Sequence, residues 1–193
     1  SPTIFYLLFT GFIGAFKAYS DAVALFGTDL NAAEMNTIVG FKISELIGMS
    51  WTPAYQFVHV VLNGQFRGLY LLMESVKRNP RCRLDVDKES GYIFEHDAYW
   101  WKEDVYLQSD AGRYYTLKYP KEENQTEQQL DYLLKVINEM ENSILAGTYE
   151  TVIDTHSFAC WLLAHDIIGN RDAAGSNIFF AKYDHTENSK VTM

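Results

Sequence analysis

The sequence predicts an α+β fold in which a β-rich lobe precedes a mainly helical lobe. Strand-like segments cluster between residues 55 and 120, whereas helical periodicity dominates between residues 126 and 169. The chain has 193 residues and is 48% hydrophobic. This length and composition suit one domain, or two small lobes that share an interface, and exclude a disordered chain.

The charge balance limits the classes of partner. The chain has 16 Lys+Arg and 25 Asp+Glu, for a formal net charge of −9, which gives no general attraction to nucleic acid or to anionic membranes. Residues 3–16 are apolar and uncharged, but this stretch is shorter than the roughly 18–20 residues that cross a bilayer. We expect no nucleic-acid partner and no evident membrane association. We interpret residues 3–16 as a buried element of the fold or, alternatively, as a cleaved signal or a membrane segment.

The first half begins with a helix and continues with strands. Apolar residues at positions i, i+3 and i+4 predict a helix over residues 29–49. The dipeptide Asn63-Gly64, flanked by the apolar runs 57–62 and 67–74, predicts a β-hairpin. Three further strands are expected at 91–97, 104–109 and 114–120.

The second half is mainly helical. Thr126 and Gln129 form a capping box before a helix of about 126–145. A second helix is expected to begin near Asp154 or Thr155 and to end at Gly169. A polar loop then leads into a strand at 178–183, and a last strand begins at 190–193.

The polar loop contains the clearest chemical motif. Arg171-Asp172 is followed by four residues and then Asn177, which gives R-D-x-x-x-x-N between a helix and a strand. Protein kinases use this spacing because the Asp accepts the substrate hydroxyl proton and the Asn binds a magnesium ion. The alternative is an ordinary polar loop whose Asp172 and Asn177 side chains bind turn backbone groups.

The helix at 126–145 carries a carboxylate within its apolar stripe. Glu141 lies in that stripe, and Glu139 points to the opposite side. The stripe comprises Leu130, Leu133, Leu134, Ile137, Met140 and Ile144. A buried carboxylate is costly without a partner, and kinases pair such a Glu with a strand Lys that contacts the nucleotide phosphates. Lys118 is the candidate partner, with Lys77 in reserve; alternatively, Glu141 reaches solvent past the helix edge or pairs with another Arg or Lys.

Other catalytic and metal motifs are absent from the sequence. The five His residues show neither H-x-x-x-H nor H-E-x-x-H spacing, and Cys82 and Cys160 lack metal-ligand spacing, so we expect no zinc site. There is no G-x-S-x-G, which argues against a serine hydrolase, and no kinase-type G-x-G-x-x-G loop.

Segments 63–76, 91–97, 117–120 and 157–180 resemble the CotH kinase family, the atypical protein kinases similar to spore coat protein H. The likeness covers roughly 35–193, as a kinase domain truncated at its C-terminal end, and leaves 1–34 without an assigned role. It implies a protein-kinase-like fold, ATP with a divalent metal such as Mg²⁺, and phosphorylation of Ser or Thr on a protein partner. The family occurs in secreted or cell-surface bacterial proteins, so the resemblance implies a surface or coat protein as the partner.

The resemblance also assigns roles within the loop. Asp172 matches the catalytic-loop Asp, and Asn177 falls where the family has a metal-binding Asn. The family's second metal-binding Asp lies in a W-D-F-[DN]-like segment, which we expect beyond Met193. The alternative function is a non-catalytic surface or coat interaction module that retains the kinase-like fold.

Overall fold

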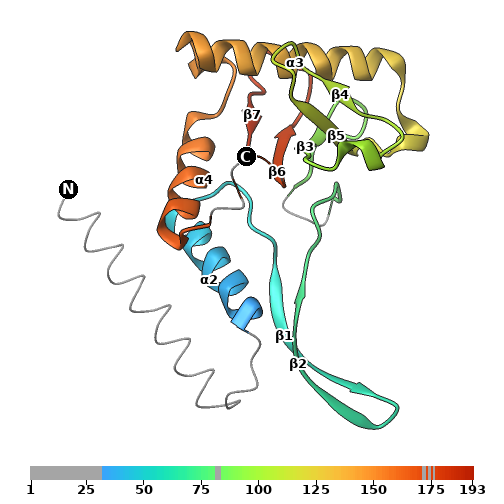
Figure 1. The fold of residues 1–193 in the computed structure, drawn as a ribbon, viewed down its shortest axis with the longest axis vertical. Coiled ribbons are helices and arrows are strands. Elements are labelled where there is room, and N and C mark those ends of the chain that lie inside the picture. Colours follow the sequence, from blue (N-terminus) through green and yellow to red (C-terminus); the bar gives the residue numbers. More distant parts are fainter. Residues whose placement is uncertain (1–31, 81–83, 171–172, 174, 176) are drawn as a thin grey trace, which may run out of the picture. The chain divides into compact units, whose positions relative to one another are not determined.

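The computed structural model describes residues 32–80, 84–170, 173, 175 and 177–193. It divides into two compact units, Ser1–Ser75 and Val76–Met193 (Figure 1). The described part contains helices and two antiparallel sheets, which confirms the predicted α+β class.

The first unit contains a helix and a β-hairpin. Helix α2 spans Ala32–Ile47, within the predicted range, and strands β1 (Tyr55–Leu62) and β2 (Gln65–Met73) pair antiparallel. The backbone at Asn63 and Gly64 is left-handed, with φ of 52° and 77°. Two such residues match the twist of the flanking strands in a type I′ turn, so the predicted hairpin is confirmed. The rings of Phe41 and Tyr55 lie 5.4 Å apart and pack α2 onto the base of the hairpin.

The second unit is built on a five-stranded sheet in the order β4-β5-β3-β6-β7. The strands are β3 (Tyr92–His96), β4 (Leu107–Gln108), β5 (Tyr114–Tyr119), β6 (Ile178–Lys182) and β7 (Val191–Thr192). Strand β6 pairs with β3, so a segment from the second half of the chain completes the sheet. The structure therefore differs from the predicted order of a β-rich lobe followed by a separate helical lobe. Central strand β3 needs hydrogen-bond partners on both of its edges, and β6, which follows the helices, supplies one of them.

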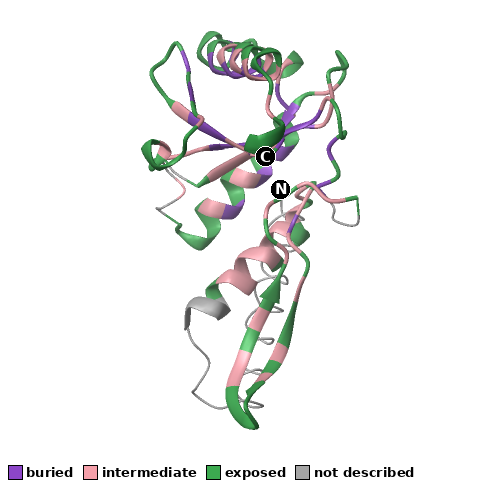
Figure 2. Cartoon of the chain, turned by 90° about the vertical axis from the view of Figure 1, so that its right-hand side faces the viewer, coloured by how far each residue is buried: buried purple, intermediate pink, exposed green. Residues whose placement is uncertain are grey.

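The core lies between this sheet and helix α3 (Figures 1 and 2). Tyr92 and Phe94 on β3 are fully buried and pack with Leu133 and Ile137 of α3. Phe180 of β6 stacks on Phe94, with ring centroids 5.2 Å apart. Because consecutive strand residues point to opposite faces, Tyr92 and Phe94 share the face toward α3, and Ile93 and Glu95 lie on the other.

Helix α3 spans Glu127–Ala146, with the predicted capping box of Thr126 and Gln129 in place. Its buried residues are Leu133, Val136, Ile137, Met140, Glu141 and Ser143. Ile144, expected in the apolar stripe, is 41% exposed. The buried face therefore keeps four of the predicted positions and adds Val136 and Ser143, whereas Leu130 and Leu134 are only partly buried.

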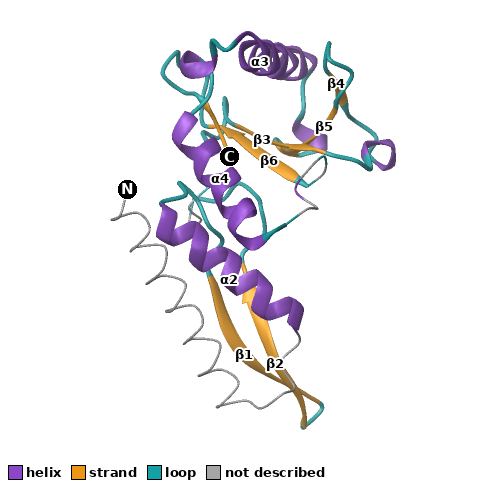
Figure 3. Cartoon of the chain, turned by 60° about the vertical axis from the view of Figure 1, so that its left-hand side comes forward, coloured by secondary structure: helices purple, strands orange, loops and turns teal. Residues whose placement is uncertain are grey.

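Helix α4 (Thr155–Ile168) begins and ends as predicted (Figure 3). The Asp154 side chain caps its N-terminus, and Gly169 ends it in the left-handed conformation, with φ of 63°. The Met193 backbone N–H donates to Ser157 Oγ at 3.1 Å, which ties the chain after β7 to α4. No helix within the described ranges is long and apolar enough to span a bilayer.

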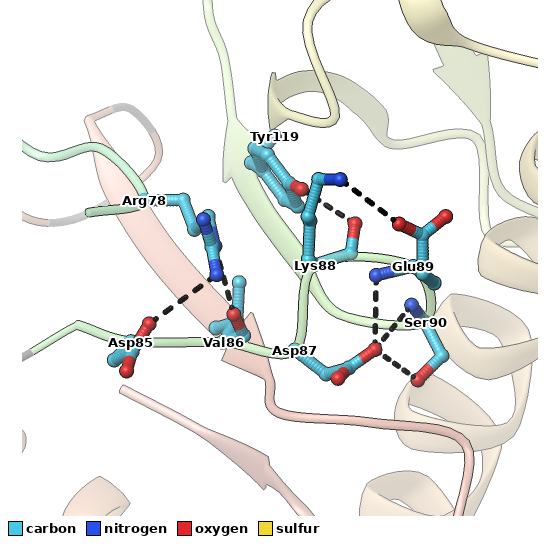
Figure 4. Close-up of polar contacts among 8 residues, drawn as sticks. All are labelled: Arg78, Asp85, Val86, Asp87, Lys88, Glu89, Ser90 and Tyr119. Carbon is cyan, nitrogen blue, oxygen red and sulfur yellow. Dashed lines mark hydrogen bonds and ion pairs between the residues drawn. The ribbon is translucent and has the colours of Figure 1, made fainter. Parts of the chain in front are cut away.

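A tight turn precedes β3 (Figure 4). Asp87 Oδ1 accepts hydrogen bonds from the backbone N–H of Glu89 at 2.9 Å and of Ser90 at 2.8 Å, and from Ser90 Oγ at 2.8 Å. Arg78 Nε donates to the Val86 carbonyl at 3.1 Å. These bonds replace a regular hydrogen-bond ladder and fix the direction in which the chain enters β3.

The close approach at Gly91 gives a stability prediction. A Cβ at Gly91 would lie 2.6 Å from the Asp87 carbonyl oxygen and 2.7 Å from the Asp87 amide nitrogen. We expect Gly91→Ala to lower the free energy of unfolding by about 1–3 kcal/mol, because backbone must move to admit the methyl group. Urea denaturation measures this change. Ser90→Ala, which removes one exposed hydrogen bond, is the control and should lower the free energy of unfolding by less. Equal decreases in the two variants would contradict the packing argument.

Candidate functional site

The loop with the R-D-x-x-x-x-N motif connects α4 to β6, so the predicted helix–loop–strand setting is confirmed. Asn177 lies immediately before β6 and is exposed, with a left-handed φ of 56°. Asn tolerates this conformation better than most residues with a side chain. Asp172 lies outside the described residues, so its catalytic role stays a prediction.

A cavity of about 290 Å³ lies beside this loop. Its polar lining comes from His96 at the end of β3, from Arg113 just before β5 and Tyr115 on β5, and from Glu141 on α3. Gly175 of the loop also lines it. Helix, sheet and loop therefore meet around one cavity, whose remaining walls are mainly apolar.

Glu141 is the buried acid of this cavity. Its side chain is 5% exposed, and its Oε1 accepts a hydrogen bond from the Tyr115 hydroxyl at 2.7 Å and from Arg113 Nη1 at 3.1 Å. Glu141 Oε2 is buried without a hydrogen-bond partner among the described residues. Burial and the bond to Glu141 raise the pKa of Tyr115, so Tyr115 stays a hydrogen-bond donor at neutral pH.

His96 lies on the wall of the same cavity. Burial lowers the pKa of its imidazole, and the nearby Arg113 charge lowers it further. These effects outweigh the opposite influence of Glu141 and Asp97, so the neutral imidazole is favoured. The fixed charges of the cavity are therefore those of Arg113 and Glu141.

A second ion pair lies on the other side of the sheet. Lys118 Nζ is 3.0 Å from Glu95 Oε2, and the Glu95 side chain is 6% exposed. Glu95 follows Phe94, which faces the α3 core, so it projects from the opposite face. Loss of hydration raises the pKa of Glu95 more than the Lys118 ammonium lowers it. The lysine therefore offsets only part of the cost of burying this carboxylate.

The structure corrects the predicted pairing of Lys118 with Glu141. Lys118 binds Glu95 and Glu141 binds Arg113, on opposite faces of the sheet. The predicted burial of Glu141 and the exposure of Glu139 are confirmed. The alternative in which Glu141 pairs with another Arg or Lys is therefore correct, because Arg113, just before β5, and Tyr115 on β5 both contact the Glu141 carboxylate. Whether Lys118 and Glu141 bind nucleotide stays a prediction.

Sequence reasoning missed Glu95 and Arg113. Glu95 is the one charged residue of the strand Tyr92–His96, a weak sign that this strand has a polar partner on one face. Arg113 directly follows the turn residue Gly112 and carries no comparable sign.

The described residues supply only part of a metal site. Asn177 offers one side-chain carbonyl oxygen, a ligand type that Mg²⁺ accepts. Nowhere in the described ranges do three His, Cys, Asp or Glu side chains gather as possible metal ligands. Asn177 as a magnesium ligand stays a prediction.

Comparison with known families matches residues 32–193 to the family described as CotH kinase protein. The chain belongs to the CotH kinase family. The resemblance noted from the sequence is thus confirmed, and the match covers the hairpin, the sheet, helices α2, α3 and α4, and the loop with Asp172. A search of curated proteins finds no match. For this CotH kinase family member, the family name indicates a kinase-like function and leaves the substrate open.

The bond between Tyr115 and Glu141 gives a second prediction. Tyr115→Phe removes a donor from a buried carboxylate and should lower the free energy of unfolding by about 1.5–3 kcal/mol, the range for hydrogen bonds to charged groups. Tyr114→Phe on the same strand is the matched control, because the Tyr114 hydroxyl only accepts an exposed bond from Gln108 Nε2 at 3.0 Å. Chemical denaturation of both variants measures the difference, and a Tyr115→Phe protein as stable as Tyr114→Phe would refute it.

Proposed function

We propose that this chain carries the phosphoryl-transfer region of an atypical protein kinase with a kinase-like fold, which uses ATP and Mg²⁺ and phosphorylates Ser or Thr of a protein partner. Membership of the CotH kinase family supports this proposal. The observation that carries it is the position of the R-D-x-x-x-x-N loop, between α4 and a strand of the same sheet that holds an anchored lysine. Phosphoryl transfer needs a carboxylate at the attacking oxygen and cations at the phosphates.

Asp172 is the proposed catalytic residue. The Ser or Thr hydroxyl oxygen bonds to the γ-phosphorus, the bond from that phosphorus to the ADP oxygen breaks, and Asp172 orients the hydroxyl and accepts its proton. Asn177 is the proposed oxygen ligand to the metal ion, which when bound neutralises charge on the phosphates.

Lys118 is the proposed phosphate contact, with Glu95 in place of Glu141 as its anchor. An ammonium group has three hydrogen-bond donors, so the 3.0 Å contact with Glu95 leaves donors for a phosphate oxygen. Holding a flexible lysine in one position reduces the entropy lost when the nucleotide binds.

Glu141 takes a different proposed role, since it holds Arg113 at the cavity that Gly175 of the loop also lines. The Arg113 side chain is 50% exposed, and a guanidinium retains further N–H donors after one bond to Glu141. Arg113 is therefore the competing candidate for a phosphate contact.

The acceptor is proposed to be a secreted or cell-surface protein, such as a coat protein, as the family resemblance implies. The net charge of −9 disfavours a nucleic acid in this role.

The central test is Asp172→Asn in the full-length protein. We expect transfer from γ-labelled ATP, measured with Mg²⁺ and the protein itself as acceptor, to fall by about 10²–10⁴-fold or more. Circular dichroism should show an unchanged fold. Asp166→Asn, an exposed position on α4, is the control and should retain transfer. Near wild-type transfer by Asp172→Asn would remove that residue from the role, and a folded wild-type protein without transfer would favour the non-catalytic interaction module.

A second experiment distinguishes Lys118 from Arg113 as the side chain that contacts the phosphates. We expect Lys118→Met to lower kcat/KM for ATP by at least about tenfold, the effect of losing about 1.4 kcal/mol of transition-state binding. Lys118→Arg keeps a positive charge beside Glu95, so it shows whether any loss of activity in Lys118→Met comes from misfolding around an unpaired Glu95. Lys121→Met is the control, since the Lys121 side chain is 74% exposed. A silent Lys118→Met together with a large loss in Arg113→Met would transfer the phosphate contact to Arg113.

A further inference from the structure

The C-terminus of α4 fixes how the chain enters the loop. The Asn170 backbone N–H donates to the His165 carbonyl at 3.0 Å, and the Gly169 N–H donates to the Asp166 carbonyl at 3.3 Å. Gly169 is left-handed, as expected for a residue that ends a helix and turns the chain. This backbone arrangement brings Asn170 back over the last turn of the helix.

A side-chain bond adds to this backbone turn. Asn170 Nδ2 lies 3.0 Å from His165 Nδ1. An amide nitrogen donates hydrogen bonds, so this contact forms when the imidazole is neutral and carries its proton on Nε2, which leaves Nδ1 as the acceptor. The contact is therefore specific to one protonation state and one tautomer.

The surroundings of His165 favour that state. Its ring packs against Trp161 of the preceding turn, with centroids 4.4 Å apart. Burial lowers the pKa of His165, so the neutral ring that can accept from Asn170 is favoured near neutral pH. The contact with Trp161 covers one part of the imidazole ring, and Asn170 Nδ2 contacts its Nδ1.

We propose that His165 is a positioning residue: through its bond to Asn170 it fixes the direction in which the chain enters the segment that carries Asp172. His165 itself touches neither substrate nor nucleotide in this scheme. Its effect on catalysis rests on the proposed function, but its effect on the start of the loop does not.

The structure supplies matched variants. His165→Asn keeps an acceptor oxygen the same number of bonds from the backbone as Nδ1, whereas His165→Leu removes the acceptor at similar size. Asn170→Ala removes the donor. A double variant of His165→Leu and Asn170→Ala then shows whether the two side chains act as one unit.

Trypsin cleavage after Arg171 of the native full-length protein measures the start of the loop without any need for turnover. Cleavage follows the population of opened chain, and a hydrogen bond of about 0.5–1.5 kcal/mol changes that population by about 2–10-fold. We expect this increase in cleavage rate for His165→Leu and for Asn170→Ala, no further increase in the double variant, and a rate near wild type for His165→Asn. Unchanged cleavage of His165→Leu, or additive effects in the double variant, would overturn the proposal.

Kinetics supply the second readout. If the protein transfers phosphate, His165→Leu should lower kcat about 2–10-fold with little change in KM for ATP, and His165→Asn should restore it. A loss confined to KM would contradict a positioning role. A wild-type protein without transfer would refute the proposed function, and the cleavage rates would then decide the role of His165 alone.

Discussion

The pairing of β3 with β5 and β6 is the constraint on which the rest of this unit depends. Tyr92, Ile93 and Phe94 are fully buried, so this strand has no solvent-facing side at its centre. Its alternation directs Phe94 toward α3 and Glu95 away from it. The register that sets His96 opposite Ile178 also fixes where the chain leaves the loop and enters β6.

This arrangement places two carboxylate–cation pairs on two faces of one sheet. An ion pair compensates part of the cost of burying each carboxylate: Arg113 pairs with Glu141, and Lys118 pairs with Glu95. The Tyr115 hydroxyl adds a third group to the first pair, whereas the second depends mainly on its lysine. The sheet therefore separates the charges of the α3 cavity from those of Lys118, so each pair can be altered without direct contact with the other.

Local features of the fold could be predicted, and features that depend on register could not. The Asn63-Gly64 turn and the Thr126 and Asp154 caps depend on neighbouring residues, and all appear as expected. The burial of Glu141 followed from helical periodicity alone. The partner of Glu141 could not be predicted in this way, because its identity depends on which face of β5 meets α3. Glu95 escaped prediction because a strand paired on both edges is recognised only once β6 is known to lie beside it.

The position of β6 also has a consequence for how the protein forms. Strand β3 and strand β6 come from distant parts of the chain, so closing this contact costs more loop entropy than forming α3 or the β1–β2 hairpin. During synthesis β5 emerges soon after β3, but β6 follows only after helices α3 and α4. Until then the Tyr92–Phe94 edge presents unpaired backbone groups and apolar side chains, the combination that favours association with other chains. The pairing of β6 with β3 thus also ends the period in which this edge of the nascent chain is exposed to association with other chains.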